Sequence, residues 1–293
     1  MKIRRLFAAG AILVLLWGMT PLVSANPYAV FVVHCEPKNA DPASFLQLRD
    51  MVVKADQHQV KLTIDFTPQW AEMILEHPVF SDLVTNWHEA GHELGAHHHP
   101  YWVSKTRGTN WDGYTNTPQE NLLGSDGENY LGDMDDYLAL LNELPGTRTS
   151  GTLGLGEPPD AIDWPQDLLY SAAGHAFEDI VSRPQKVEYA GHVVWQMKHG
   201  LLSNGLPEQV ENAYAAAVPG DIVAVVTHVS NYEDFPQAVE NYFAFLGSQD
   251  PSGNTLVTVT EAMNLAVPEP STIWLALLVG WMLIGRHRRQ RRA

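Results

Sequence analysis

The residues best suited to chemistry are three consecutive histidines, His97, His98 and His99, which follow a short predicted strand at 93–96. Imidazole is the commonest metal-ligating side chain in proteins. On an extended segment alternate residues share a face, so His97 and His99 can bind one ion together while His98 points away. A histidine-rich tract can also be a solvated loop that binds nothing.

Two other predicted strands also end in side chains that bind metals or transfer protons. His34 and Glu36 follow the apolar run 28–33, and His228 follows the apolar run 222–227. In a parallel barrel the carboxyl ends of all strands meet on one rim, so these side chains should converge. Two or three histidines with one carboxylate form the ligand set of a catalytic Zn²⁺ ion, and a further histidine can transfer protons near neutral pH. Taken singly, the glutamate could cap a loop and each histidine could be a satisfied core residue.

The elements that must position these residues alternate between strand and helix. Strands are predicted at 28–33, 60–66 and 93–96, with helices at 45–55, 69–76 and 81–90 between them. This order favours a parallel sheet with right-handed crossovers, hence an α/β fold. Further strands are expected at 148–152, 186–189, 193–195, 222–227 and 256–259, and further helices at 132–144, 166–170, 207–217 and 235–246.

Two polar stretches lie between these elements. The segment 100–129 lacks periodicity and carries Trp102, Trp111 and Tyr114 among amides and hydroxyls. Such side chains suit a sugar-binding cleft, because sugar rings have apolar faces ringed by hydroxyls; a surface loop anchored by its own aromatics is the alternative. The aspartates that begin the helix after it, between 133 and 136, are interpreted as capping residues.

Both ends of the sequence predict export. Residues 1–25 have basic residues, an apolar run and a small-x-small site, as in a signal peptide cleaved by signal peptidase. Near the other end, Val-Pro-Glu-Pro at 267–270 leads into the apolar segment 272–285 and an arginine cluster. This order resembles the PEP-CTERM sorting signal, which implies transient membrane attachment and processing by an exosortase in a bacterium that makes extracellular polysaccharide. A marginal transmembrane anchor is the alternative interpretation.

The balance of acidic and basic residues limits the classes of polymer that the protein can bind. The chain has 18 basic and 34 acidic residues, and loss of the two terminal segments removes eight basic residues and one acidic residue, leaving a net charge of about −23. Such a charge disfavours nucleic acid and anionic polymers and suits a neutral or cationic polysaccharide, unless it serves solubility alone. Cys35 is the only cysteine, so no intramolecular disulfide forms, and we expect it to be a small buried hydrophobe.

The segment from Gly91 to His97 resembles the second motif of the polysaccharide deacetylase superfamily. That resemblance implies a distorted (β/α)7 barrel and a metal-dependent hydrolase that removes N- or O-acetyl groups from glycans. His97 matches the first metal-binding histidine of the motif. The second metal-binding histidine of the motif would fall at position 101, where this sequence has Tyr101 instead. His99 is therefore assigned as the second histidine ligand by geometry.

The other assignments implied by the resemblance come from elements farther along the chain. Glu36 matches the metal-binding acidic residue of the first motif, and His34 stands where the family has its aspartate base. His228 resembles the general-acid histidine, and Arg148 matches the arginine motif as a substrate-binding residue. The resulting organisation is a signal peptide at 1–25, a deacetylase-like domain at 27–262 and a sorting segment at 267–293.

Three functions follow from this sequence. The first is an exported deacetylase with a divalent metal, Zn²⁺ by its ligand set, acting on extracellular or cell-wall polysaccharide. The second is a non-catalytic glycan-binding or matrix protein on the same barrel. The third is a glycosidase that uses carboxylates such as Asp65 and Glu157.

Overall fold

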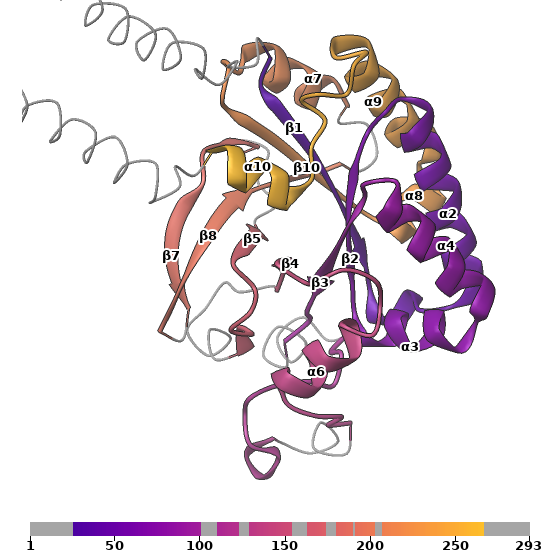
Figure 1. The fold of residues 1–293 in the computed structure, drawn as a ribbon, viewed down its shortest axis with the longest axis vertical. Coiled ribbons are helices and arrows are strands. Elements are labelled where there is room, and N and C mark those ends of the chain that lie inside the picture. The colour runs from indigo at the N-terminus through magenta and orange to yellow at the C-terminus, as the bar shows by residue number, and fades with distance from the viewer. Residues whose placement is uncertain are drawn as a thin grey trace, which may run out of the picture.

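The centre of the computed structural model is a curled sheet of mostly parallel strands (Figure 1). The structure describes residues 26–100, 110–122, 129–153, 163–173, 180–189, 191–202 and 207–266. Seven strands run parallel, in the spatial order β10-β1-β2-β3-β4-β5-β8. They are β1 (Tyr28–Cys35), β2 (Leu62–Phe66), β3 (Glu93–His97), β4 (Ser150–Thr152), β5 (Tyr170–Ala173), β8 (His192–Lys198) and β10 (Ile222–His228).

The sheet closes on itself through a short segment directly after β8. There β9 (Gly200–Leu201) leaves the neighbourhood of β5 and pairs in parallel with β10. Two antiparallel strands flank this junction, β6 (Val181–Ser182) on β10 and β7 (Gln185–Tyr189) on β8. The α/β fold and the distorted seven-stranded barrel that the sequence predicts are therefore confirmed.

The register of the strands aligns the ends that carry the predicted site. Strands β1 and β10 are apolar almost throughout and buried on both faces, as expected for parallel strands. Their pairing places His34 beside His228, and the pairing of β1 with β2 places His34 beside Asp65. One layer further along the barrel, Glu36 follows the end of β1 and His97 ends β3.

Helices α2 (Pro42–Gln57), α4 (Pro78–Glu89), α8 (Val229–Asp234) and α9 (Pro236–Gln249) cover the outside of the barrel on one flank of β1 and β2 (Figure 1). Asp133 and Asp136 form a capping box at the start of α6, which confirms the capping interpretation. Cys35 is buried, also as expected. The helices are α2 (Pro42–Gln57), α3 (Pro68–Glu76), α4 (Pro78–Glu89), α6 (Met134–Leu141), α7 (Pro207–Ala216), α8 (Val229–Asp234), α9 (Pro236–Gln249) and α10 (Val259–Ala266), with 3-10 turns η1 (Pro37–Asn39) and η2 (Gln119–Asn121).

Helix α10 fills the end of the barrel opposite to the predicted site. Its Val259 and Met263 pack against Val30 and other small aliphatic side chains of the barrel interior. Glu93, at the start of β3, accepts hydrogen bonds from the hydroxyl of Thr260 at 2.5 Å and from its backbone N–H at 2.9 Å. With this end closed, the carboxyl ends of the strands form the rim at which chemistry can take place.

Two predicted elements are wrong. Residues 256–259 make one isolated bridge from Leu256 to Ala29, and the chain then enters α10, because its apolar residues pack inside the barrel as one helical face. Residues 166–170 form a turn leading into β5, a four-residue strand held by its two neighbours and too short to show a period of its own.

No helix in the described ranges is long and apolar enough to cross a membrane. The predicted signal peptide, the sorting segment and the aromatic residue Trp102 lie outside the described residues, as does Tyr101.

Candidate metal centre

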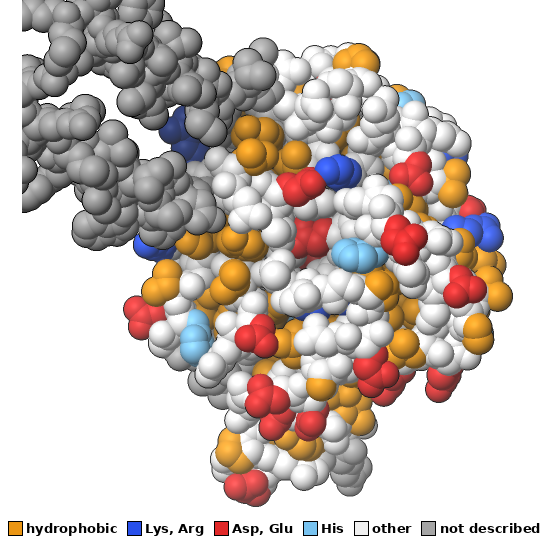
Figure 2. Space-filling model, viewed as in Figure 1, with side chains coloured by type: hydrophobic (Ala, Val, Ile, Leu, Met, Phe, Trp, Pro, Cys, Tyr) orange, Lys and Arg blue, Asp and Glu red, His pale blue; other side chains and the backbone are white. Residues whose placement is uncertain are grey.

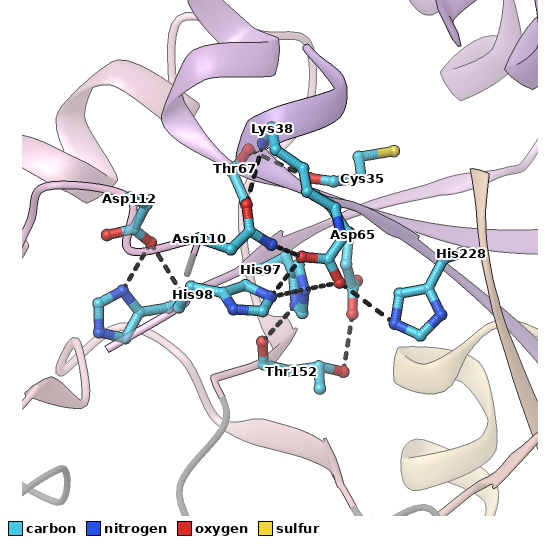
Figure 3. Close-up of polar contacts among 12 residues, drawn as sticks. Cys35, Lys38, Asp65, Thr67, His97, His98, Asn110, Asp112, Thr152 and His228 are labelled. Atoms are coloured by element: carbon cyan, nitrogen blue, oxygen red, sulfur yellow. Dashed lines mark hydrogen bonds and ion pairs between the residues drawn. The ribbon is translucent and has the colours of Figure 1, made fainter. Parts of the chain in front are cut away.

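The carboxylate of Glu36 is the centre of the candidate site. Figure 3 shows His97, Asn110 and His228, which all contact it. Its Oε2 lies 2.6 Å from Nε2 of His99, and its Oε1 lies 3.4 Å from Nε2 of His97 and 3.2 Å from Nε2 of His228. The Nε2 atoms of His97 and His99 are themselves 3.0 Å apart. The structure thus brings together side chains from the ends of β1, β3 and β10, although they are more than 60 residues apart in sequence.

The protonation pattern of His97 favours a cation between these atoms. Its Nδ1 lies 2.8 Å from the backbone carbonyl of Thr152, so Nδ1 must carry the proton and donate. In a neutral imidazole Nε2 is then an unprotonated acceptor that faces a carboxylate oxygen. Burial lowers the pKa of His97 despite its contacts with Glu36, so a second proton is not the expected solution. Two acceptors would then face each other, and a metal ion bound by the Nε2 lone pair removes this repulsion. Nδ1 donation to a carbonyl is how metal-binding histidines are usually oriented.

The spacing and charge of the donor atoms also fit a metal. Tetrahedral ligands about 2.0 to 2.2 Å from Zn²⁺ lie roughly 3.3 to 3.6 Å from one another. Among Glu36, His97 and His99 the separation of 3.4 Å lies in that range, whereas those of 3.0 and 2.6 Å are about 0.3 and 0.7 Å shorter than its lower limit. Burial opposes ionisation of Glu36, but the neighbouring His228, His97 and His99 outweigh it and lower the pKa of Glu36, so the carboxylate is charged.

His34 lies beneath this group on the inward face of β1. Its ring stacks on His97 with centroids 4.1 Å apart, and it meets His228 edge to face at 5.1 Å. Burial lowers the pKa of His34 well below its usual value, and His97, His228 and His199 lower it further, so the imidazole is neutral. His34, Glu36 and His97 also offer ligand atoms within 4.8 Å of one another. We favour His99 as the third ligand, because its Nε2 lies 2.6 Å from Oε2 of Glu36 and 3.0 Å from Nε2 of His97.

His199 is a member of this cluster that the sequence analysis missed. It is fully buried between β8 and β9, and its ring centroid lies 5.5 Å from that of His34. The signal was present, because His199 directly follows a strand, as His228 does. The predicted strand at 193–195 ended before Lys198, and so the relation was not visible.

Asp65 and Gly95 form the layer below the histidines. Oδ2 of Asp65 accepts a hydrogen bond from the Thr152 hydroxyl at 2.9 Å, and burial raises the pKa of Asp65 well above its usual value. A Cβ atom on Gly95 would lie 2.0 Å from Oδ1 of Asp65. A carboxyl that is 1% exposed and held in this way is poorly placed to act on a glycosidic bond. Glu157, its predicted partner in that reaction, lies outside the described residues.

His98 points away from the cluster, as the alternation of the strand predicts (Figure 3). Its Nδ1 donates to Oδ2 of Asp112 at 2.8 Å, and its Nε2 lies 3.6 Å from Oδ2 of Asp163. Burial alone would lower the pKa of His98, but the two carboxylates raise it to about 10. The middle histidine of the triplet is therefore a charged structural residue that holds the neighbouring loop.

Two of the residues expected to bind substrate, Arg148 and Tyr114, are buried. Arg148 is buried, and its guanidinium donates to the carbonyls of Leu141, at 2.8 Å, and of Pro145. Arg148 therefore stabilises the end of α6, and its assignment as a substrate-binding residue stays a prediction. Tyr114 is 6% exposed and packs edge to face on Tyr137.

Trp111, a further aromatic residue of the segment 100–129, makes a hydrogen bond within that segment. Nε1 of Trp111 donates to the carbonyl of Tyr114 at 3.3 Å. This part of the segment 100–129 therefore fits the alternative interpretation, a loop anchored by its own aromatic side chains. Its assignment as a sugar-stacking surface stays a prediction for Trp111 and Trp102.

Comparison with known proteins identifies the fold. No protein-family model matches this sequence, and no curated protein sequence matches it. Among solved structures, a Mycobacterium smegmatis protein described as a polysaccharide deacetylase is similar at a TM-score of 0.51 and 12% identity, over 84% of this chain and 92% of the other. The 4-alpha-glucanotransferase of Thermococcus litoralis is similar at a TM-score of 0.52 and 12% identity, over 83% of this chain. The chain spans 39% of the glucanotransferase.

These likenesses define the class of fold, a distorted α/β barrel similar to those of a protein described as a polysaccharide deacetylase and of a 4-alpha-glucanotransferase. At 12% identity they carry no information about the reaction. What the chain does must therefore be argued from the chemistry of its own site.

Proposed function

We propose that the protein is an exported, metal-dependent hydrolase that removes acetyl groups from a polysaccharide. The observation that carries the proposal is the meeting of Glu36 with the unprotonated Nε2 of His97 and with Nε2 of His99 at the carboxyl end of the barrel. The fold, which is similar to that of a protein described as a polysaccharide deacetylase, is compatible with this reaction. The resemblance of the segment 91–97 to the deacetylase motif supports it independently.

Glu36, His97 and His99 would hold the metal, and their nitrogen and oxygen donors suit Zn²⁺. Bound there, a divalent ion polarises an acetyl carbonyl and lowers the pKa of a water molecule toward neutrality. Glu36 would bring one negative charge to the site and leave it a net positive charge to stabilise a developing oxyanion.

His228 and His34 are the proposed proton-transfer residues. The side chain of His228 is 21% exposed at the rim, and its Nδ1 lies 2.8 Å from Oδ1 of Asn231, so Asn231 fixes the orientation of the ring. From there His228 would donate a proton to the leaving amine or hydroxyl. His34 is neutral and can therefore accept a proton as general base.

The negative charge of the chain suits a neutral or cationic glycan. Acidic side chains outnumber basic ones over the face seen in Figure 2, in keeping with the net charge of the whole chain. Acetylated amino-sugar polymers carry no negative charge and become cationic as acetyl groups are removed from nitrogen. The proposed partners during export are signal peptidase and exosortase, and the proposed location of the mature protein is the cell surface or extracellular matrix.

Comparison of two histidine variants tests the metal and acid roles separately. His97→Ala removes a ligand, so bound zinc and acetate release from acetylated glucosamine oligomers should both be lost, as they should on chelation of the wild type. His228→Ala should keep its zinc and lose turnover by roughly 10²- to 10⁴-fold, the usual contribution of a positioned acid. Wild-type protein that binds no zinc, or that releases acetate unchanged in a chelator, would contradict the proposal.

A non-catalytic glycan-binding protein is the second candidate. The burial of His34 favours it, because a base that is 1% exposed and covered by the His97 ring has little room to meet a water molecule. That function predicts retention on a glycan column without release of acetate. Release of new reducing ends, without acetate, would indicate instead the cleavage of a glycosidic bond.

A further inference from the structure

Asn110 has an unusual backbone conformation next to the metal centre. Its φ of 83° lies in the left-handed region, and among the described residues only Gln59, with a φ of 58°, shares this property without being glycine. The left-handed conformation costs about 1 to 2 kcal/mol, although asparagine tolerates it better than most residues. Such conformations persist where the surrounding structure fixes them, and they cluster at functional sites.

The side chain of Asn110 joins the carboxylate of the site to the turn that follows β1 (Figure 3). Its Nδ2 donates to Oε2 of Glu36, and its Oδ1 accepts from the backbone N–H of Lys38 at 3.0 Å. The reverse orientation of the amide would set oxygen against the carboxylate and NH₂ against an N–H, so the two contacts define the orientation together. Both ends of the amide are therefore used to hold the end of β1.

Asn110 is itself held in place through Asp112, which is buried. Oδ2 of Asp112 accepts from Nδ1 of His98 at 2.8 Å and from the backbone N–H of His99 at 2.9 Å. The Gln69 side chain donates to the carbonyl of Asp112 at 2.7 Å. The loop is thus fixed to the end of β3, the same strand end that supplies His97 and His99. Displacement of Asn110 would require these buried contacts to break.

We propose that Asn110 is a positioning residue that orients the Glu36 carboxylate toward the metal. The inference rests on the proposed metal site. Asn110 and His99 both contact Oε2, so the amide restricts rotation of the carboxylate and leaves Oε1 directed at His97. Loss of such a supporting contact typically lowers metal affinity by about 10- to 100-fold.

Asn110→Gly is the informative variant, because glycine adopts a φ of 83° without strain and so preserves the loop while it removes the amide. Gln59→Gly is the matched control: it also relieves a left-handed φ and also loses one side-chain hydrogen bond, from Nε2 to the carbonyl of Pro251. Zinc affinity is measured by competition with a chromophoric chelator, and the thermal midpoint is measured without metal. Asn110→Gly should bind zinc about 10- to 100-fold more weakly, and Gln59→Gly should bind it as the wild type does.

The zinc affinities distinguish a failure of the positioning role of Asn110 from a failure of the proposed metal site. If the wild type binds zinc and Asn110→Gly binds it equally well, the positioning role is overturned and the proposed metal site stands. If the wild type binds no zinc, both are overturned. Should Asn110→Gly lose its thermal transition, Asn110→Asp gives the second measurement, because aspartate tolerates the left-handed φ and lacks the Nδ2 donor; unchanged zinc affinity there also overturns the inference.

Discussion

Replacement of Gly95 by alanine should destabilise the protein through a clash with Asp65. The added Cβ would lie 2.0 Å from Oδ1 and 3.1 Å from Cγ of Asp65, whereas ordinary contacts begin near 3.4 Å. The carboxyl would have to move by about 1.4 Å, the difference between 2.0 and 3.4 Å, in a site where it is buried and bonded to Thr152. Overpacking of this kind costs about 1 to 3 kcal/mol, and loss of the hydrogen bond adds about 1 kcal/mol. The expected loss in the free energy of unfolding is therefore about 2 to 4 kcal/mol.

A double-mutant cycle with Asp65→Ala shows whether the clash is the cause. Asp65→Ala removes the atoms that the new methyl group meets, so Gly95→Ala should cost about 1 to 3 kcal/mol less in that background. Urea unfolding, followed by tryptophan fluorescence, gives each free energy, provided that the m-values agree. A loss below about 0.5 kcal/mol for Gly95→Ala, or additive effects in the cycle, would refute the reasoning.

Three further predictions concern His34, Asp65 and the C-terminal segment. His34→Asp restores the residue type of the resembled base and should keep zinc while retaining or raising acetate release; loss of zinc would instead make His34 a ligand. Asp65→Asn should flatten the pH dependence of stability. In the wild type the pKa of Asp65 is raised in the folded state, so the unfolded chain loses this proton first as the pH rises. The free energy of unfolding of the wild type therefore falls by about 1.4 kcal/mol per pH unit from about pH 4 up to the folded pKa. Urea midpoints between pH 5 and 7 that fall equally in both proteins would contradict this. Mass spectrometry of exported protein should show cleavage near residues 267–270, and an intact arginine-rich end would exclude the sorting-signal interpretation.

The sequence alone was sufficient for six of the seven parallel strands, all but β5, and for most of the histidine cluster. Strand β10 is a continuous apolar run that ends in His228, and such runs are typical only of strands buried on both faces. The alternation at the end of β3 separated His97 and His99 from His98, because side chains on an extended chain change face at every residue. These inferences succeeded because local period and strand direction decide them.

What only the tertiary structure decided are the contacts between segments distant in sequence. Asn110 donates a hydrogen bond to Glu36, which lies 74 residues away in sequence. No local sequence pattern identifies such an asparagine in an aperiodic loop. Arg148 matched a motif position by order along the chain, yet its guanidinium meets the end of α6, because the burial and the partners of a side chain depend on how the helix packs. Strand β5 and helix α10 were predicted wrongly because neighbouring strands and the barrel interior, rather than local propensity, fix their conformation. Sequence periodicity thus determined which strand ends carry chemistry, and long-range packing determined which side chains join them there.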